Sequence, residues 1–242
     1  MTAWLADTLV ATTGLLLLVL ALREPVRRQF GAGAAYALWL VPAARIAMPT
    51  MTKTVERTVA PAPAIEPQAM AVAAPPLPPP DPSLLDSVGG LAGLALWLWL
   101  GGAALMLVHG LATYRRQRRQ VLGAAVQLAR LGSIRIVRSE AVRGPLAFGI
   151  LDRVIALPVD FDTRFDERQR RLALDHELAH HRSGDLVANL VAYVLLCLQW
   201  FNPLAWVSHA AFRFDQEAAC DARVLDKAKG PDRAAYGQAI AK

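Results

Sequence analysis

The chain has 242 residues, of which 55% are hydrophobic and 19% charged, and its net charge is +6. This is apolar for a soluble protein, and the length allows one or two domains. The two cysteines, Cys197 and Cys220, exclude a disulfide framework and lie in no CxxC pattern, so both are interpreted as small apolar residues. The positive charge does not by itself indicate nucleic acid, because arginines beside apolar segments usually report orientation in a membrane.

Three segments are long enough to cross a bilayer, which takes about 20 apolar residues. Residues 4–22 form the first, and the arginines that follow rather than precede it favour a retained span over a signal peptide. Residues 30–48 form a weaker span that contains a proline and an arginine. Residues 87–114 form the clearest span. The sequence therefore predicts three N-terminal transmembrane helices, two of them within residues 1–49.

The charges between these segments indicate one orientation. Arginines follow the first span and form RRQRR after the third, whereas the Pro- and Ala-rich loop at residues 50–86 carries few positive charges. The positive-inside rule then places the N-terminus and this loop outside and residues 115–242 in the cytoplasm. RRQRR could instead bind nucleic acid, but its position directly behind an apolar span favours lipid. We expect a multi-pass protein of a bacterial-type inner membrane, with the lipid bilayer as a partner and no direct nucleic-acid partner.

The pattern changes after the arginines. Residues 120–133 are predicted as a short amphipathic helix that ends at glycine, and residues 134–139 alternate as a half-buried strand does. Residues 147–158 contain one or two further strands, with a turn near Asp152. Residues 162–181 have helical spacing and begin with an aspartate or threonine cap. The order of these elements predicts an α+β domain with a small β-sheet.

His176, Glu177 and His180 form an HExxH motif. On a helix, the two histidines lie one turn apart on the same face and can bind one metal ion. Glu177 lies beside them and could take a proton from a water molecule that zinc polarises. The alternative is an ordinary charged helix face, because this short motif also arises by chance.

A third ligand would favour the metal site, and residues 213–226 contain a candidate. Glu217 and Asp221 are four residues apart and share a helix face. Glu217 could complete a His₂Glu zinc site with one open position, the arrangement of catalytic zinc. Asp221 could accept a hydrogen bond from the free ring nitrogen of a ligand histidine. The alternative is an ordinary acidic helix, but the joint pattern predicts a metallopeptidase.

Other residues near the motifs have less specific interpretations. His181 points about 100° away from the second motif histidine and is interpreted as a surface or supporting residue. Asp185 could cap the next helix or steady the site, and we favour the cap. Cys220 lies one position from the ligand face, so packing explains it. Tyr236 or Arg213 could stabilise the transition state.

The apolar segment at residues 186–201 separates the two motifs. A single crossing of the bilayer there would place Glu217 and the histidines on opposite sides, and residues 204–212 are too few to cross back. A shared site therefore requires a core helix, or a helix that lies in or dips into the membrane, with Asn202 and Pro203 at the bend.

Three stretches, HELAHHRSGDLVANLV, WFNPLAW and RFDQEAACDARVL, resemble the M56 peptidases, the family of the membrane sensor-transducers for β-lactam resistance. The resemblance implies a cytoplasmic gluzincin-type domain in which a signal from outside activates cleavage of a repressor or of the protease itself. The implied residues are zinc ligands His176, His180 and Glu217, catalytic Glu177 and supporting Asp221. The SxxK serine motif of the family's β-lactam receptors does not occur in these residues, and the chain stops within an expected helix, as a fragment would.

These observations predict an integral membrane zinc endopeptidase. Its cofactor is Zn²⁺, and its partner is a protein substrate such as a cytoplasmic transcriptional repressor, or the protein itself. One alternative is a receptor that signals by conformational change and has a structural metal site. Another is a quality-control peptidase similar to the M48 group. The substrate, the inducing signal and the oligomeric state stay open.

Overall fold

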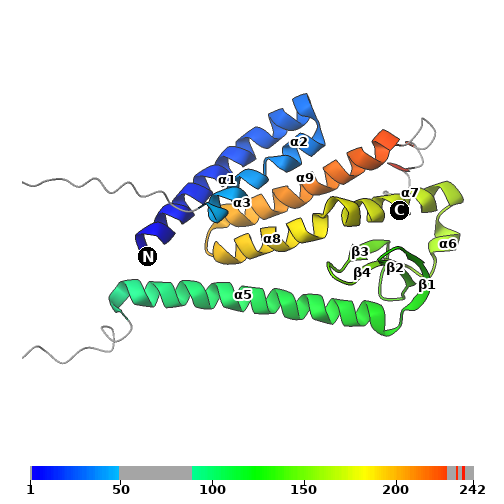
Figure 1. Cartoon of the computed structure of the whole chain (residues 1–242), viewed down its shortest axis with the longest axis horizontal. Coiled ribbons are helices and arrows are strands. Elements are labelled where there is room, and N and C mark those ends of the chain that lie inside the picture. The colour runs from blue at the N-terminus through cyan, green and yellow to red at the C-terminus, as the bar shows by residue number, and fades with distance from the viewer. Residues whose placement is uncertain (1, 49–88, 228–232, 234–235, 238–242) are drawn as a thin grey trace, which may run out of the picture.

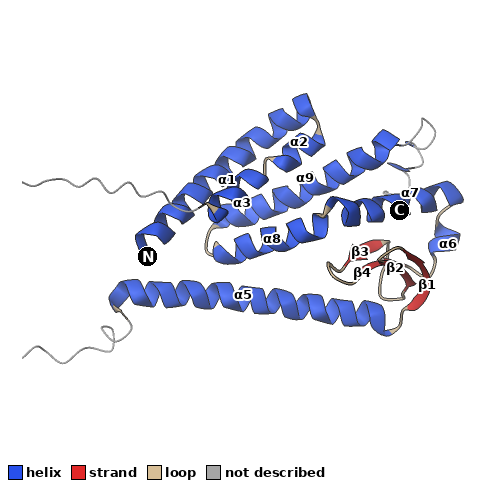
Figure 2. Ribbon diagram, in the orientation of Figure 1, coloured by secondary structure: helices blue, strands red, loops and turns tan. Residues whose placement is uncertain are grey.

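The computed structural model describes residues 2–48, 89–227, 233 and 236–237. A group of long helices forms most of this part of the protein, and a small sheet lies at one end (Figures 1 and 2). The predicted extracytoplasmic loop at residues 50–86 lies outside the described residues.

Two of the described helices are long and apolar enough to cross a membrane: α1 (Thr2–Phe30) and α5 (Gly90–Gly123). They coincide with the first and third predicted spans. The second predicted span is divided into α2 (Ala32–Ala37) and α3 (Leu40–Ala47), each too short to cross alone. Gly31 separates α1 from α2 with a φ of 89°, which glycine adopts without strain. A single continuous second span is therefore not confirmed.

The four-stranded sheet has the order β1-β2-β4-β3. Its strands are β1 (Val126–Leu131), β2 (Ile134–Arg138), β3 (Leu146–Phe148) and β4 (Arg153–Leu157). β2 and β4 are parallel in the centre, and β1 and β3 are antiparallel edge strands. The strands expected within residues 134–139 and 147–158 are confirmed. The helix expected at residues 120–133 is wrong, because α5 continues to Gly123 and β1 then pairs with β2.

The end of α5 is tied directly to the sheet. Arg118 in its last turns and Arg135 on β2 both form ion pairs with Asp152, the residue before β4. Asp152 was predicted to lie in a turn. Arg118, one of the arginines near the end of α5, thus links this helix to the loop before β4.

After the short helix α6 (Phe161–Arg164), α7 (Glu167–Ser183) carries the HExxH motif. Asp166 and Gln169 form a reciprocal capping box at its start, which satisfies backbone N–H groups that the helix leaves unpaired. Gly184, with a φ of 73°, ends α7 and starts α8 (Asp185–Leu198). The cap expected at the start of residues 162–181 is wrong in position, because the extended residue Phe165 separates α6 from α7 and Asp166 caps α7 instead.

The apolar segment between the motifs folds back on itself. α8 is followed by α9 (Pro203–Lys227), and the Asn202 side chain accepts a hydrogen bond from the Leu204 N–H at the bend. α8 packs against α5, where Gly102 and Gly110 leave room for Trp200 and Tyr193. This hairpin agrees with the predicted non-crossing segment.

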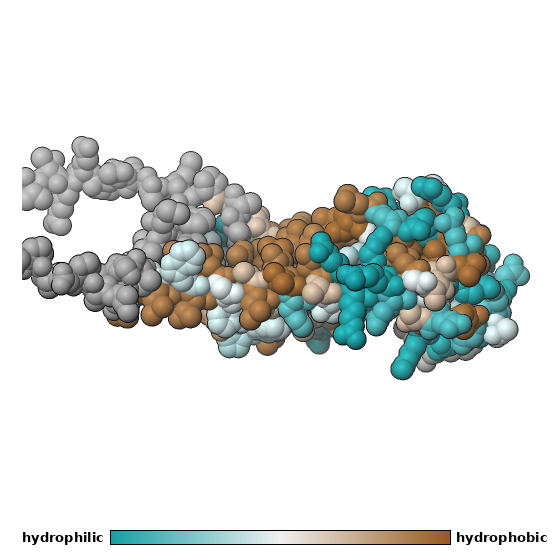
Figure 3. Space-filling view, turned by 90° about the horizontal axis from the view of Figure 1, so that it is seen from below, coloured by the Kyte–Doolittle hydropathy of each residue, from teal (hydrophilic) through white to brown (hydrophobic). Residues whose placement is uncertain are grey.

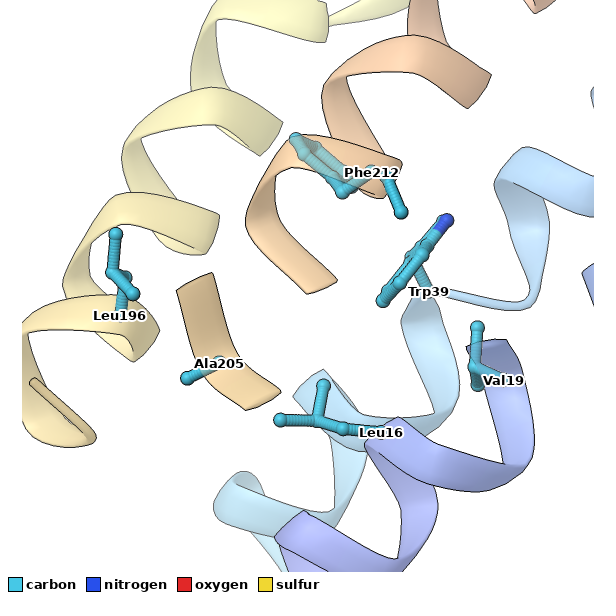
Figure 4. Close-up of a cluster of buried hydrophobic side chains, with 7 residues drawn as sticks. Leu16, Val19, Trp39, Leu196, Ala205 and Phe212 are labelled. Carbon is cyan, nitrogen blue, oxygen red and sulfur yellow. The ribbon is translucent and has the colours of Figure 1, made fainter. Parts of the chain in front are cut away.

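The helices share a buried apolar cluster, and one face of the molecule changes from apolar to polar along its length (Figure 3). A buried cluster joins α1, α8, α9 and the start of α3, and Figure 4 labels six of its members: Leu16, Val19, Trp39, Leu196, Ala205 and Phe212. Ala211 also belongs to it. On the face seen in Figure 3, apolar residues predominate over the middle of the molecule, whereas hydrophilic residues gather toward the end with the sheet. This face is thus divided along its length into an apolar region and a polar region.

Candidate metal centre

The two motif histidines turn one nitrogen each toward a common point. Their rings are perpendicular, with centroids 4.7 Å apart, and the two Nε2 atoms are 3.1 Å apart. The spacing of four residues on α7 produces this arrangement, as the sequence indicates. Both side chains are largely shielded from solvent, with exposed fractions of 17% and 12%.

Glu217 on α9 completes a triangle of ligand atoms. Its Oε2 lies 3.6 Å from Nε2 of His176 and 3.5 Å from Nε2 of His180. A tetrahedral zinc ion with bonds of about 2.0–2.1 Å separates its ligand atoms by roughly 3.3 Å. The three side chains therefore fit a zinc ion with little rearrangement. The structure brings together the three residues that the sequence suggested as ligands.

The Nδ1 atoms of the two histidines, which face away from the common point, also have partners. Nδ1 of His176 lies 2.7 Å from the Tyr236 hydroxyl and 3.3 Å from Oδ1 of Asp221. The same hydroxyl donates to Asp221 over 2.6 Å. Partners of this kind fix the tautomer and orientation of a metal-binding histidine. Asp221 thus lies where the supporting role was expected, with Tyr236 beside it.

Asp185 has the second of its two predicted roles: it contacts the site and does not cap α8. Its fully buried carboxylate instead lies 2.9 Å from Nδ1 of His180 and accepts hydrogen bonds from Tyr36 and Arg223. The interpretation as a cap is wrong, because Gly184 ends one helix and begins the next and Asp185 points into the protein.

A second buried carboxylate anchors α9 near Glu217. Asp215 is 1% exposed and accepts two hydrogen bonds of 2.8 Å from Arg23 on α1. The indole N–H of Trp39 donates a third over 2.9 Å. The helix that carries Glu217 is therefore fastened to the N-terminal helices two residues away from the candidate ligand.

Glu177 lies between the histidines and the sheet. Its Oε2 accepts a hydrogen bond of 2.6 Å from the backbone N–H of Ala147 on β3. Burial raises the pKa of Glu177, although the neighbouring histidines act in the opposite direction. Contacts with the two histidines instead hold the pKa of Glu217 far below its ordinary value. The surroundings of the two glutamates therefore differ: burial dominates at Glu177, and contacts with the histidines dominate at Glu217.

His181 is not a surface residue. It is 6% exposed, and its Nε2 lies 3.1 Å from the carbonyl oxygen of Val154 on β4. Because adjacent residues on a helix point about 100° apart, His181 faces the sheet while His180 faces α9. His181 therefore attaches the motif helix to the sheet, which corresponds to the supporting alternative.

An open cleft of about 1010 Å³ leads to the site. Its lining includes His176, Glu177, Glu217, Asp221 and Tyr236, together with residues of the segments at 142–145 and 158–160. Tyr236 thus lies at the cleft, but its hydroxyl is already engaged by His176 and Asp221. Arg213 is exposed and does not line the cleft. Neither residue acquires an evident role as a transition-state stabiliser.

Cys220 was assigned to packing, yet it lies beside the histidines. Its sulfur and one ring nitrogen from each of His176 and His180 all lie within 4.8 Å of one another. Burial raises the pKa of its thiol, but contacts with both histidines outweigh burial and bring the pKa below its ordinary value. In the sequence, the only signal was its position three residues after Glu217.

Comparison with known proteins is consistent with this arrangement. The model of the BlaR1 peptidase M56 family matches residues 3–242. The chain belongs to the M56 peptidase family. The family resemblance inferred from the motifs is thereby confirmed, and the membrane-length helices α1 and α5 agree with membrane association.

Two kinds of named relative of this M56 protein are similar over part of its length. The methicillin resistance mecR1 proteins of Staphylococcus aureus and Staphylococcus epidermidis are 26% identical over 164 residues, 62% of this chain. The regulatory protein BlaR1 of Bacillus licheniformis is 31% identical over 105 residues, 43% of this chain. The matched segments cover only 28% and 17% of the relatives' own lengths.

Proposed function

We propose that this chain is an integral membrane zinc endopeptidase that cleaves a cytoplasmic regulatory protein, such as a transcriptional repressor, or itself during transmembrane signalling. The observation that carries the proposal is the triangle of His176, His180 and Glu217 with Glu177 nearby. His176, Glu177 and Glu217 line an open cleft. The family membership and the regulatory names of the relatives support it.

Three side chains would hold the ion and one would handle the proton. His176, His180 and Glu217 would bind Zn²⁺, which supplies Lewis-acid polarisation of a water molecule and a substrate carbonyl. Glu177 would accept the proton of the attacking water at its carboxylate and deliver it to the leaving amine. Its raised pKa suits both directions of transfer. Asp221, Tyr236 and Asp185 would hold the histidine rings in place.

The sheet offers a place for the substrate backbone. β3 is an edge strand, and the N–H of its central residue, Ala147, points toward Glu177 rather than toward β4. Edge strands bind extended peptides through main-chain hydrogen bonds. A peptide laid along this edge would pass over Glu177 and the histidines, which favours an endopeptidase that accepts extended segments.

The charge pattern of the sequence supports an orientation with the N-terminus outside and the site in the cytoplasm. In this orientation α8 and α9 form a hairpin beside the membrane helices, and the sheet lies in the polar region of Figure 3. The site would then face cytoplasmic proteins.

The test uses the full chain in detergent micelles with a mixture of fluorogenic peptides and with its own cleavage as readouts. Glu177→Gln should retain one zinc ion per chain and lose hydrolysis by at least about 100-fold, since general acid–base catalysis contributes that much. Glu140→Gln, an exposed glutamate, is the matched control and should behave as the wild type. Retained hydrolysis in Glu177→Gln would overturn the mechanism, and normal signalling by it in cells would favour a receptor with a structural metal.

A further inference from the structure

The two histidines are flanked by different groups on two sides. Glu217, whose side chain is 46% exposed, approaches from the side of the cleft. Cys220 is fully buried, and its sulfur lies 3.6 Å from the carbonyl oxygen of His176 at the contact between α7 and α9. A metal ion held by the histidines would therefore have a carboxylate near the cleft and a thiol toward the interior.

The spacing on α9 allows both groups to reach one ion. Residues three apart on a helix are neighbours, and Glu-x-x-His pairs at this spacing bind shared metal sites in helical bundles. The thiolate is a preferred zinc ligand and loses its proton when it coordinates. The sulfur and a ring nitrogen of each histidine lie within 4.8 Å of one another, whereas zinc bonds of about 2.0–2.1 Å to nitrogen and about 2.3 Å to sulfur require roughly 3.6 Å between two such ligands. A shift of about 1 Å would therefore let the sulfur bind the same ion.

We propose that Cys220 is a ligand of the same ion as His176 and His180, so that the resting site is closed by a thiolate. With Glu217 the ion then has four protein ligands, the arrangement of structural zinc, and has no position for water. Peptide hydrolysis requires the sulfur to leave. This inference rests on the proposed function and deepens it, because it assigns the same site a resting state in which only the molecules that have released the sulfur hydrolyse peptides.

The position of Cys220 suggests how the thiolate would be released. α9 also carries Asp215, which Arg23 and Trp39 hold against the N-terminal helices. A movement of α1 or α3 relative to α7 would turn α9 and change the distance from Cys220 to the histidines. The residues from 215 to 220 thus join the membrane helices and the closing ligand on one rigid element.

Cobalt spectroscopy tests the proposal without relying on activity. The full chain in micelles, freed of metal, is loaded with one Co²⁺ per chain, and a thiolate-to-cobalt charge-transfer band is recorded in the near ultraviolet. The band should be present in the wild type and in Cys197→Ser, which alters the other buried cysteine. Cys220→Ser should lose the band while it still binds cobalt.

X-ray absorption at the zinc edge gives a second readout that does not depend on the folding of Cys220→Ser. The chain has two cysteines, so any thiolate in Cys197→Ser belongs to Cys220. Zinc-loaded Cys197→Ser should show a sulfur shell at about 2.3 Å. A shell of only nitrogen and oxygen, or a charge-transfer band that persists in Cys220→Ser, would overturn the proposal. These results would leave the peptidase proposal intact, whereas failure of the wild type to bind any metal would overturn both.

Discussion

The buried carboxylate of Asp185 lies 2.9 Å from Nδ1 of His180, and it also binds Tyr36 and Arg223. One group thus connects a candidate metal ligand, a helix of the N-terminal part and the last long helix. A buried carboxylate needs several partners to offset its loss of hydration. Because three elements supply those partners, the orientation of His180 depends on how the elements are packed.

Asp185→Asn tests this dependence. The amide has the same size but no charge, so it orients the His180 ring less strongly and weakens the basicity of the ring. We expect zinc affinity to fall about 10–100-fold, the usual effect of losing a partner of a metal-binding histidine. Competition with a chromogenic chelator measures it. Asp226→Asn, on the exposed end of α9, is the control, and equal affinities in the two variants would contradict the role of Asp185.

Tyr236→Phe distinguishes positioning from catalysis. The change removes the hydroxyl that contacts both His176 and Asp221. If Tyr236 acts by holding His176, zinc affinity should fall by about tenfold or more, and added zinc should restore most of the hydrolysis. Chelator competition and hydrolysis at saturating zinc measure the two effects. A large loss of hydrolysis with unchanged affinity would assign Tyr236 to the transition state instead.

His181 and His180 should respond differently to replacement. His181→Ala removes the contact with Val154 on β4 and should destabilise the fold by about 1–3 kcal/mol, while one zinc ion per chain is retained. His180→Ala should lose the zinc. Thermal unfolding in micelles and metal analysis by mass spectrometry check both results. If the His181→Ala variant is fully folded but lacks zinc, His181 is one of the ligands.

Two adjacent glycines of α5 provide a test of the contact with α8. A methyl group at Gly102 would overlap the Trp200 ring, whereas one at Gly101 meets nothing within 4 Å. Gly102→Ala should therefore destabilise the protein by about 1–3 kcal/mol, and Gly101→Ala should be neutral or slightly stabilising because alanine favours helices. Thermal unfolding midpoints in the same detergent compare them. Equal midpoints would show that Trp200, in the turn after α8, does not pack closely at Gly102.

Local patterns predicted the parts of the fold that local interactions determine. The motif helix and the central strands follow from residue spacing within short stretches. The segment at residues 126–131 was assigned to a helix, because a short amphipathic stretch fits either structure. The segment is a strand because it pairs with β2. This pairing depends on where α5 ends relative to the sheet.

The candidate site also has parts that the local sequence predicts and parts that it does not. The spacing within HExxH, and that between Glu217 and Asp221, places side chains that can bind a metal ion on one face of a helix. Asp185 and Tyr36 are 149 positions apart in the sequence, and Asp215 and Arg23 are 192 positions apart. No local sequence pattern predicts contacts over such separations. The burial of His181 likewise depends on the face of α7 that the sheet covers.

The attachment of Asp215 to Arg23 and Trp39 has a practical consequence for anyone who wishes to isolate the peptidase. Removal of residues 1–48 would take away both partners of Asp215, two residues before Glu217. It would also uncover the apolar side chains of α8 and α9 that pack against Leu16, Val19 and Trp39, and exposing apolar surface to water costs free energy. The membrane anchor and the candidate catalytic unit are therefore a single cooperative structure, and a shortened soluble protein would start from a damaged metal site.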